Sequence, residues 1–201
     1  MPQHDFIKGP AGNLQGIYRE STLDIAAVLV CHPHPQYGGT MHNKVTYRIA
    51  KAFSDKGHAV MRFNFRGVDL SEGEWADGVG EAEDVKACID WLAQRHSTIW
   101  LAGFSFGAYA GLRGVVDDER VERLFAVAPA VSLYDFSFLD NERRSLTVVH
   151  GTEDEIVPYE QVQAWVHAHP VARLYGIEGA GHFFPKHMDE MLAALLSGIA
   201  D

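Results

Sequence analysis

The sequence has little of three features that would indicate particular partners or compartments. Its two cysteines, Cys31 and Cys88, stand in separate apolar segments, so we expect buried thiols rather than a disulfide framework or a CxxC metal or redox motif. Only 17 Lys and Arg oppose 27 Asp and Glu, and the formal charge of −10 predicts no nucleic-acid partner and no anionic membrane surface as partner. Because no apolar stretch reaches about 18 residues, we expect a soluble, cytoplasmic protein.

Length and hydrophobic content limit the architecture. With 201 residues, of which 47% are hydrophobic, the chain can bury one sizeable core but is short for two ordinary domains and a linker. We therefore predict a single domain over residues 1–201. The sequence contains no internal repeat and no low-complexity tract.

From residue 25 onward, strand-like apolar runs alternate with segments of helical periodicity. Continuous apolar runs such as residues 25–31 are typical of parallel strands that are covered on both faces. Residues 6–8 and 14–19 flank a turn rich in Gly and Pro, which predicts a hairpin at one sheet edge. The pattern predicts the α/β class, with a mostly parallel, twisted sheet of about eight strands and helices on both faces. The strand-like runs are 25–31, 58–65, 98–104, 124–128, 145–150 and 171–177, and the helical ones are 43–56, 81–96, 106–116, 159–168 and 185–199.

Residues 103–107 read Gly-Phe-Ser-Phe-Gly, which matches the pattern Gly-x-Ser-x-Gly between a predicted strand and a predicted helix. At such a turn the serine backbone is strained and its hydroxyl is lifted out of the fold, while Gly103 and Gly107 let neighbouring backbone pass closely. The pentapeptide alone is equally compatible with a glycine-rich turn that contains a serine. The rest of the chain decides between the two.

Two further strand ends carry the groups that a serine nucleophile needs. Residues 151–158 read Gly-Thr-Glu-Asp-Glu-Ile-Val-Pro and follow one strand, and His182 follows the last strand after Gly-Ala-Gly. The carboxyl ends of parallel strands gather at one edge of the sheet, so we expect these groups to lie near Ser105. The residues alone leave Glu153, Asp154 and Glu155 open as the acid.

Together these motifs resemble the α/β-hydrolase superfamily over nearly the whole chain. The order Ser, Asp, His, the serine turn, the acid loop Gly-x-x-Asp-x-x-Val-Pro and Gly-His at 181–182 carry the resemblance. The His-Pro-His-Pro and Gly-Gly-Thr-Met stretch at 32–41 and the short length are similar to the small, lidless bacterial serine hydrolases of the dienelactone hydrolase group. Asp69 departs from the relatives' pattern Arg-Gly-x-Gly-x-Ser, so the role of the loop 66–73 stays open.

The resemblance implies a Ser-His-Asp triad and an acyl-enzyme intermediate. Ser105 would be the nucleophile, His182 the general base, and Asp154, which the family spacing selects over its two neighbours, the residue that orients the imidazole. The oxyanion hole would use the amide of Phe106 and one amide from the loop after the third strand. Pro33 and Pro35 have no N–H, so we predict His34, with Gln36 or Tyr37 as alternatives.

The resemblance implies no cofactor. His32 and His34 are two residues apart, but no third ligand stands at metal-binding spacing near them, so we predict no metal site.

The substrate is the least determined feature. Residues 129–144 are too few for a cap domain, so we expect an open site with an apolar acyl pocket, for which Tyr37, Tyr134, Phe136 and Phe183 are candidates. We expect a small-molecule ester or thioester substrate and a monomer or homodimer. A peptidase, perhydrolase or lyase with the same triad, or a non-catalytic binding module, are the alternatives.

Overall fold

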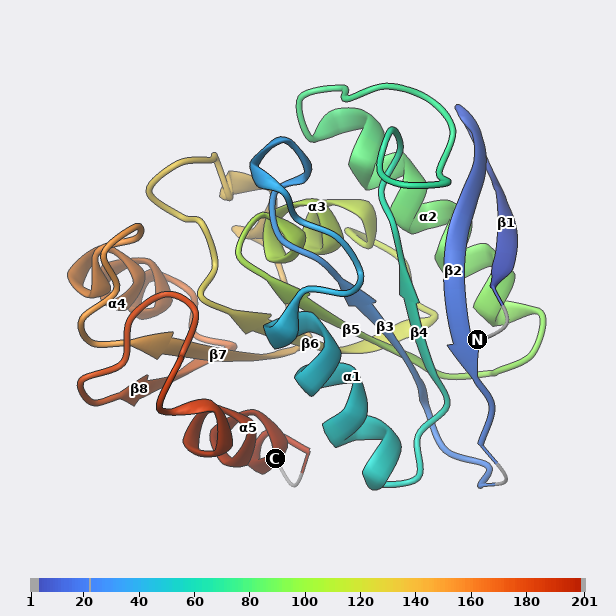
Figure 1. The fold of residues 1–201 in the computed structure, drawn as a ribbon. Helices are drawn as coiled ribbons and strands as arrows, with labels where there is room; N and C mark the ends of the chain where they lie inside the picture. Colours follow the sequence, from blue (N-terminus) through green and yellow to red (C-terminus); the bar gives the residue numbers. More distant parts are fainter. Residues whose placement is uncertain (1–3, 22, 200–201) are drawn as a thin grey trace.

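A single twisted sheet forms the centre of the protein (Figure 1). The computed structural model describes residues 4–21 and 23–199, so residues 1–3, 22 and 200–201 of the predicted domain lie outside the described residues. The eight strands follow the order β1-β2-β4-β3-β5-β6-β7-β8, in which β2 pairs antiparallel with β1 and β4 and the other pairs are parallel. The predicted α/β class is confirmed. The strands are β1 (Asp5–Gly9), β2 (Gly12–Arg19), β3 (Ala27–Cys31), β4 (Val60–Phe63), β5 (Ile99–Phe104), β6 (Val121–Val127), β7 (Ser145–Gly151) and β8 (Ala172–Ile177).

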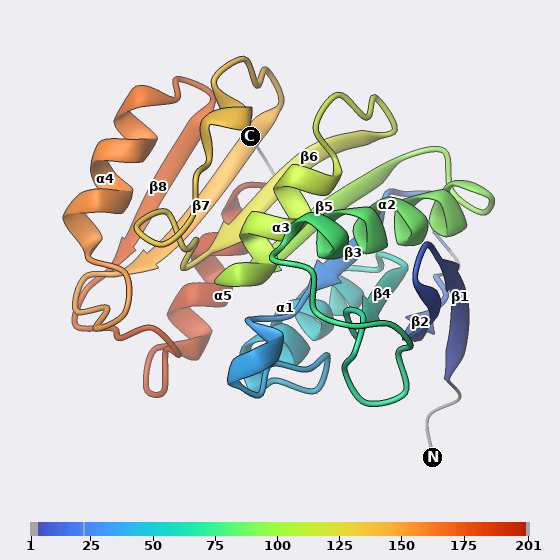
Figure 2. The same ribbon diagram turned by 90° about the horizontal axis from the view of Figure 1, so that it is seen from above.

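Helices cover both faces of the sheet (Figures 1 and 2). One face is covered by α1 and α5, and the other by α2, α3 and α4. Among the described residues, no helix combines the length and the apolar character that crossing a membrane requires. The helices are α1 (Lys44–Asp55), α2 (Val79–Ala93), α3 (Phe106–Gly114), α4 (Tyr159–Ala168) and α5 (Met188–Ser197).

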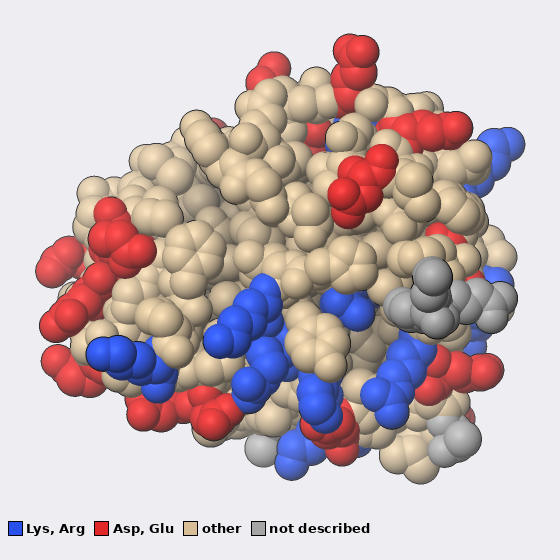
Figure 3. Space-filling model, in the orientation of Figure 1, with Lys and Arg blue, Asp and Glu red and all other residues tan. Residues whose placement is uncertain are grey.

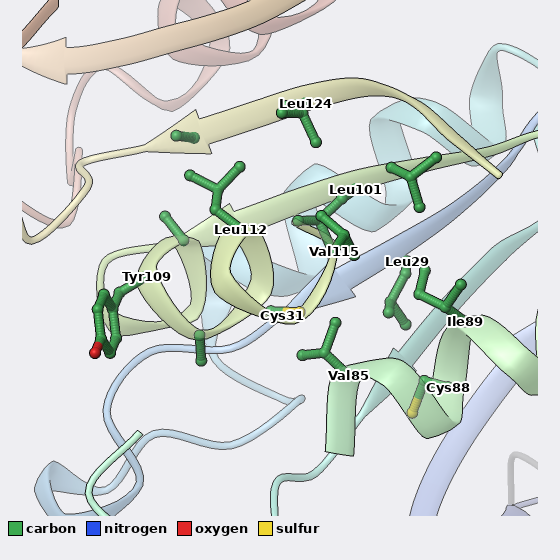
Figure 4. Packing of buried hydrophobic residues seen from close by; sticks show 14 of the residues in the cluster. Leu29, Cys31, Val85, Cys88, Ile89, Leu101, Tyr109, Leu112, Val115 and Leu124 are labelled. Carbon is green, nitrogen blue, oxygen red and sulfur yellow. The ribbon is translucent and has the colours of Figure 1, made fainter. Parts of the chain in front are cut away.

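The central strands are buried on both sides, which accounts for their uninterrupted apolar sequences. All residues of β3 and β5 are buried. Figure 4 shows side chains of α2 and α3, among them Val85, Ile89 and Leu112, packed with Leu29 and Leu101 of these strands. Both cysteines are free, buried thiols, and burial raises the pKa of Cys31.

Several element boundaries differ from the predictions by two or three residues, and two of the differences have a clear cause. The strand predicted to begin at residue 124 begins at Val121. The polar residues Glu122 and Arg123 interrupt the apolar pattern, so the sequence does not indicate where the strand starts. The last helix begins at Met188, three residues after Pro185. Phe184 has a φ of 51° and is fully buried, and the turn that buries its ring delays the start of the helix.

The fold has no cap domain. Residues 128–144, which connect β6 to β7, contain only the short turn η2 (Ser137–Leu139). The carboxyl ends of the parallel strands therefore remain accessible.

The loop between β4 and α2 is held in place by buried acids. The carboxylate of Asp84 is fully buried and accepts hydrogen bonds from the guanidinium of Arg66 at 2.7 Å and from the Arg66 amide at 3.0 Å. Glu81, also fully buried, accepts from the amides of Ala76 and Gly78. Asp69 has a φ of 48°, so it occupies the left-handed conformation that favours glycine.

We predict that the Arg66–Asp84 pair contributes much more to stability than an exposed pair on the same helix. Replacing Asp84 with Ala leaves the Arg66 cation without its partner and should lower the free energy of unfolding by about 3–5 kcal/mol, measured by urea denaturation. Lys86→Ala, which breaks the exposed Lys86–Glu83 pair, is the control and should cost about 0–1 kcal/mol. Equal losses in both variants would contradict this prediction.

Candidate active site

Ser105 lies at a strained turn between β5 and α3. Its φ of 55° and ψ of −120° are unusual for a residue with a side chain. A side chain at Gly103 would clash with the backbone of Gly107, and one at Gly107 would clash with the carbonyl groups of Cys31 and His32. The two glycines therefore allow β5, α3 and the end of β3 to approach one another, and this contact supports the turn.

The structure brings Ser105, His182 and Asp154 together from three strand ends. His182, which follows β8, has its Nε2 atom 3.0 Å from the Ser105 hydroxyl oxygen. Its Nδ1 atom lies 2.8 Å from Oδ2 of Asp154, which follows β7. All three side chains are nearly inaccessible to solvent, with residue exposures of 9%, 2% and 8% for Ser105, His182 and Asp154. The arrangement forms a continuous hydrogen-bonded chain from hydroxyl to carboxylate.

Asp154 is held in its ionised form. Burial acts to raise its pKa, but hydrogen bonds from His182 and from the amides of Val157 and Ile156 outweigh burial and hold the pKa below the ordinary value. Both amides lie 2.8 Å from Oδ1. An ionised Asp154 accepts a hydrogen bond from the Nδ1–H group of His182. Nε2 is then unprotonated and can accept the proton of the Ser105 hydroxyl.

The two neighbouring acids do not contact the imidazole ring. Glu153 is exposed, and its carboxylate makes no hydrogen bond within the described part of the chain. Glu155 accepts a hydrogen bond from the backbone amide of His182 at 3.1 Å. Glu155 thereby ties the loop that carries the histidine to the loop that carries the acid.

His150 lies beside Asp154, and the motifs in the sequence do not indicate this position. Its Nε2 atom donates to the carbonyl of Val157 at 2.8 Å and lies 3.3 Å from Oδ2 of Asp154. Burial lowers its pKa, which favours the neutral ring. The position of His150 at the end of β7, directly before the acid loop, is the signal that would identify it.

Two backbone amides at the site have no hydrogen-bond acceptor among the described residues. They belong to Phe106, the residue after the serine, and to His34, in the loop after β3. The alternatives are engaged elsewhere, since the Gln36 amide donates to the His34 ring and the Tyr37 amide donates to the His34 carbonyl. The His34 ring packs against the rings of Tyr37, Trp75 and Phe106, with centroids 4.7, 4.7 and 4.9 Å away.

A cleft of about 390 Å³ opens beside Ser105. Tyr37, Tyr134 and Phe183, three of the four predicted pocket residues, line it. Phe136 does not, and its assignment is corrected. It is 4% exposed and packs in the core against Tyr109, Phe138 and Trp165, because the chain turns inward after Asp135 and buries the ring.

Two further residues of the cleft wall are not predicted from the sequence. Leu133 and Ile156 line the cleft although 59% and 42% of their surface is exposed. In the sequence, the only indication of this role is that each is an apolar residue in a polar loop. No lining residue carries a charged Asp, Glu, Lys or Arg side chain, and the full set is Pro33, His34, Tyr37, Gly38, Gly39, Asn43, Ser105, Phe106, Ala130, Leu133, Tyr134, Ile156, His182 and Phe183.

His32 serves the fold. Its Nδ1 atom donates to the Pro33 carbonyl at 2.6 Å, and its Nε2 atom accepts from the Phe65 amide at 3.1 Å. Burial lowers the pKa of His32 to about 3, so the ring is neutral. Both ring nitrogens are thus occupied, and the Nε2 contact joins the β3 loop to the segment after β4. Within residues 4–21 and 23–199 no group of three His, Cys, Asp or Glu could hold a metal ion.

Comparison with known proteins identifies the family. A family model described as X-Pro dipeptidyl-peptidase (S15 family) matches residues 21–147, which include the serine turn. The chain belongs to this family of α/β hydrolases. The hydrolase is 37% identical to an uncharacterized protein of Rickettsia prowazekii, over 97% of this chain and 87% of the relative.

Solved structures of similar proteins support the assignment. An α/β serine hydrolase homologue from Coxiella burnetii is 39% identical and has a TM-score of 0.92, with 98% of this chain and 97% of the other covered. A member of the α/β serine hydrolases without a lid, from Xanthomonas campestris, is 34% identical and has a TM-score of 0.89, with 98% and 93% covered. This hydrolase therefore shares its fold with both serine hydrolases, and it lacks a cap domain as the Xanthomonas protein lacks a lid.

We predict that Glu155, but not Glu153, supports the position of His182. Glu155→Ala removes the acceptor of the His182 amide and should lower kcat/KM for any substrate that the protein hydrolyses by about 3- to 10-fold, in keeping with the loss of one hydrogen bond of roughly 0.5–1.5 kcal/mol. Glu153→Ala is the control and should leave the rate unchanged. A larger loss at Glu153 than at Glu155 would refute the assignment of the two roles.

Proposed function

We propose that this α/β hydrolase is a carboxylesterase-like enzyme that cleaves small, uncharged esters or thioesters through an acyl-enzyme on Ser105. The observation that carries the proposal is the hydrogen-bonded chain from Ser105 through His182 to Asp154, with links of 3.0 and 2.8 Å. A hydroxyl is a weak nucleophile, and a base in hydrogen-bond contact, itself held by a carboxylate, is what activates it.

The reaction follows from the proton positions. His182 Nε2 takes the hydroxyl proton while Ser105 Oγ attacks the substrate carbonyl carbon, and the carbonyl oxygen becomes negatively charged. The unpaired amides of His34 and Phe106 are the proposed donors to that oxygen. His182 then gives its proton to the leaving alcohol or thiol as the carbon–oxygen or carbon–sulfur bond breaks. Water, activated by the same imidazole, attacks the acyl-enzyme, releases the acid and restores Ser105.

The chemistry of the cleft favours uncharged, apolar acyl groups. A substrate carboxylate in the cleft would need a cation, and the N-terminal ammonium of a peptide would need a carboxylate, yet no charged side chain lines the cleft. Four side chains at the cleft, Tyr37, Leu133, Phe183 and Ile156, are 87%, 59%, 46% and 42% exposed. They offer apolar surface to an acyl chain at the cleft mouth.

Peptidase activity is the second candidate, because the matching family model is described as a dipeptidyl-peptidase. An enzyme that removes a dipeptide from a free N-terminus must bind the terminal ammonium. The uncharged lining of the cleft argues for an ester substrate instead.

We predict that a fluorophosphonate labels Ser105 alone. The base, the carboxylate and the oxyanion donors that stabilise a tetrahedral acyl intermediate also favour attack at phosphorus. Mass spectrometry should find one adduct, which is absent in Ser105→Ala and His182→Ala. Asp154→Asn should reduce kcat by up to about 10⁴-fold because it stabilises the wrong tautomer of His182. If the wild-type protein is shown to be folded and takes up no label, this result would indicate a non-catalytic binding module.

We also predict selectivity for uncharged acyl groups. A hexanoyl ester should be hydrolysed with a kcat/KM at least about 100-fold above that of a succinyl monoester of the same alcohol, since the free carboxylate finds no cation in the cleft. Leu133→Ser should lower the hexanoyl rate by roughly fourfold, equivalent to losing about one buried methylene, and Leu70→Ser, at an exposed site outside the cleft, should not. Faster cleavage of an X-Pro arylamide than of the hexanoyl ester would favour the peptidase.

A further inference from the structure

A second concave site lies away from the catalytic cleft, between α1 and the strands β2 and β4. It has a volume of about 250 Å³ and shares no lining residue with the cleft. In the antiparallel β2–β4 pair, Ile17 stands opposite Arg62 and Arg19 stands opposite Val60. Opposed residues, and residues two apart on one strand, project from the same face, so both arginines extend from the face that α1 only partly covers.

The site is basic although the protein as a whole is acidic. In Figure 3, Lys and Arg side chains gather over α1 in the lower half of the view, while Asp and Glu prevail in the upper half. Lys51, which also lines the site, is neutralised by Asp55 at 2.7 Å. Within the described part of the chain, no carboxylate lies within 4.0 Å of Arg19 or Arg62. The three lining cations and the one paired acid leave a local charge of +2 in a chain with a formal charge of −10.

The contacts that Arg62 makes use only part of its guanidinium. Nη1 donates to the Met41 carbonyl at 2.7 Å, and the group lies over the Tyr47 ring, with Cζ 5.2 Å from the ring centroid. Nε and Nη2 have no acceptor among the described residues. Burial lowers the pKa of Arg62, which reflects the cost of placing a cation there without a counter-ion. A purely structural role for Arg62 explains one of its guanidinium donors, but it does not explain why a cation without a counter-ion is placed there.

We propose that this site binds the phosphate group of a small organic phosphate. Arg19 and Arg62 supply the net charge, and the Lys51 ammonium and the hydroxyls of Tyr47 and Ser54 supply further donors from the facing helix. A phosphate monoester carries close to two negative charges and three acceptor oxygens, which suits several donors that converge from three elements, whereas a carboxylate offers two oxygens and one charge. The volume is below the usual range of about 300–1,000 Å³ for ligand pockets, so the ligand is small.

Calorimetric titration of the full chain with phenyl phosphate, inorganic phosphate and benzoate at constant ionic strength tests the proposal. Phenyl phosphate should bind saturably at one site and more tightly than benzoate. Arg19→Gln should weaken binding about fivefold, as expected for one exposed ion pair, and Arg62→Gln about tenfold or more. Lys44→Gln, which removes the same charge from α1 outside the site, is the control and should change the affinity less than twofold.

The outcomes separate this proposal from its alternatives. Equal losses in Arg19→Gln and Lys44→Gln would show that only net charge attracts the anion and would overturn the site. If benzoate binds as tightly as phenyl phosphate, the assignment of a phosphate ligand is overturned. If inorganic phosphate binds as tightly as phenyl phosphate, the organic group of the ligand has no role in binding. Ser105→Ala should bind phenyl phosphate unchanged, so this result does not depend on whether the protein is an esterase.

Discussion

The left-handed backbone of Ser105 is the constraint on which the active site depends. The conformation persists because β5, α3 and the end of β3 are packed so closely that only glycine fits at 103 and 107. The same packing brings the loop after β3, with the His34 amide, to the side of the serine. One local strain thus positions both the proposed nucleophile and the proposed oxyanion donors, and the fully buried strands β3 and β5 hold it.

The second requirement is an acid that stays ionised when it is buried. Asp154 meets it through donors from its own loop, the amides of Ile156 and Val157, together with the imidazole of His182. Glu155 joins the loops after β7 and β8, and His150 binds the Val157 carbonyl within the loop after β7. The geometry of the histidine is therefore maintained by a network that spans two loops, and a single contact to the imidazole is only one part of it.

The cleft at Ser105 and the basic site at Arg19 and Arg62 have opposite chemistry. The cleft at Ser105 lies at the carboxyl ends of the strands, is uncharged and has an apolar mouth. The basic site lies on the face of β2 and β4 beside α1, where the sheet changes from parallel to antiparallel pairing. Because no cap covers the strand ends, the short loops alone form the walls of the cleft. Its selectivity therefore rests on few side chains.

The chain order of strands and helices could be read from the sequence because buried parallel strands and amphipathic helices leave strong periodic signals. The serine turn, the acid loop and the final histidine could be read because each is a short motif at a strand end. The start of α5 could not, because the buried ring of Phe184 determines it through contacts made only in the folded state. The prediction that Phe136 lines the pocket is wrong because an aromatic residue in a loop is equally suited to the core and to a pocket. Its contacts in the folded chain place it in the core.

Local sequence pattern, together with the rule that strand ends meet at one edge of the sheet, indicates the fold class, the order of the motifs and the residue types available for catalysis. The folded chain is needed to show which of three adjacent acids contacts His182, which amides have no acceptor among the described residues, and that Arg19 and Arg62 face one site without a neighbouring carboxylate. Those properties depend on the direction in which each side chain and amide points. Contacts between residues distant in the chain set that direction, and local sequence does not encode it.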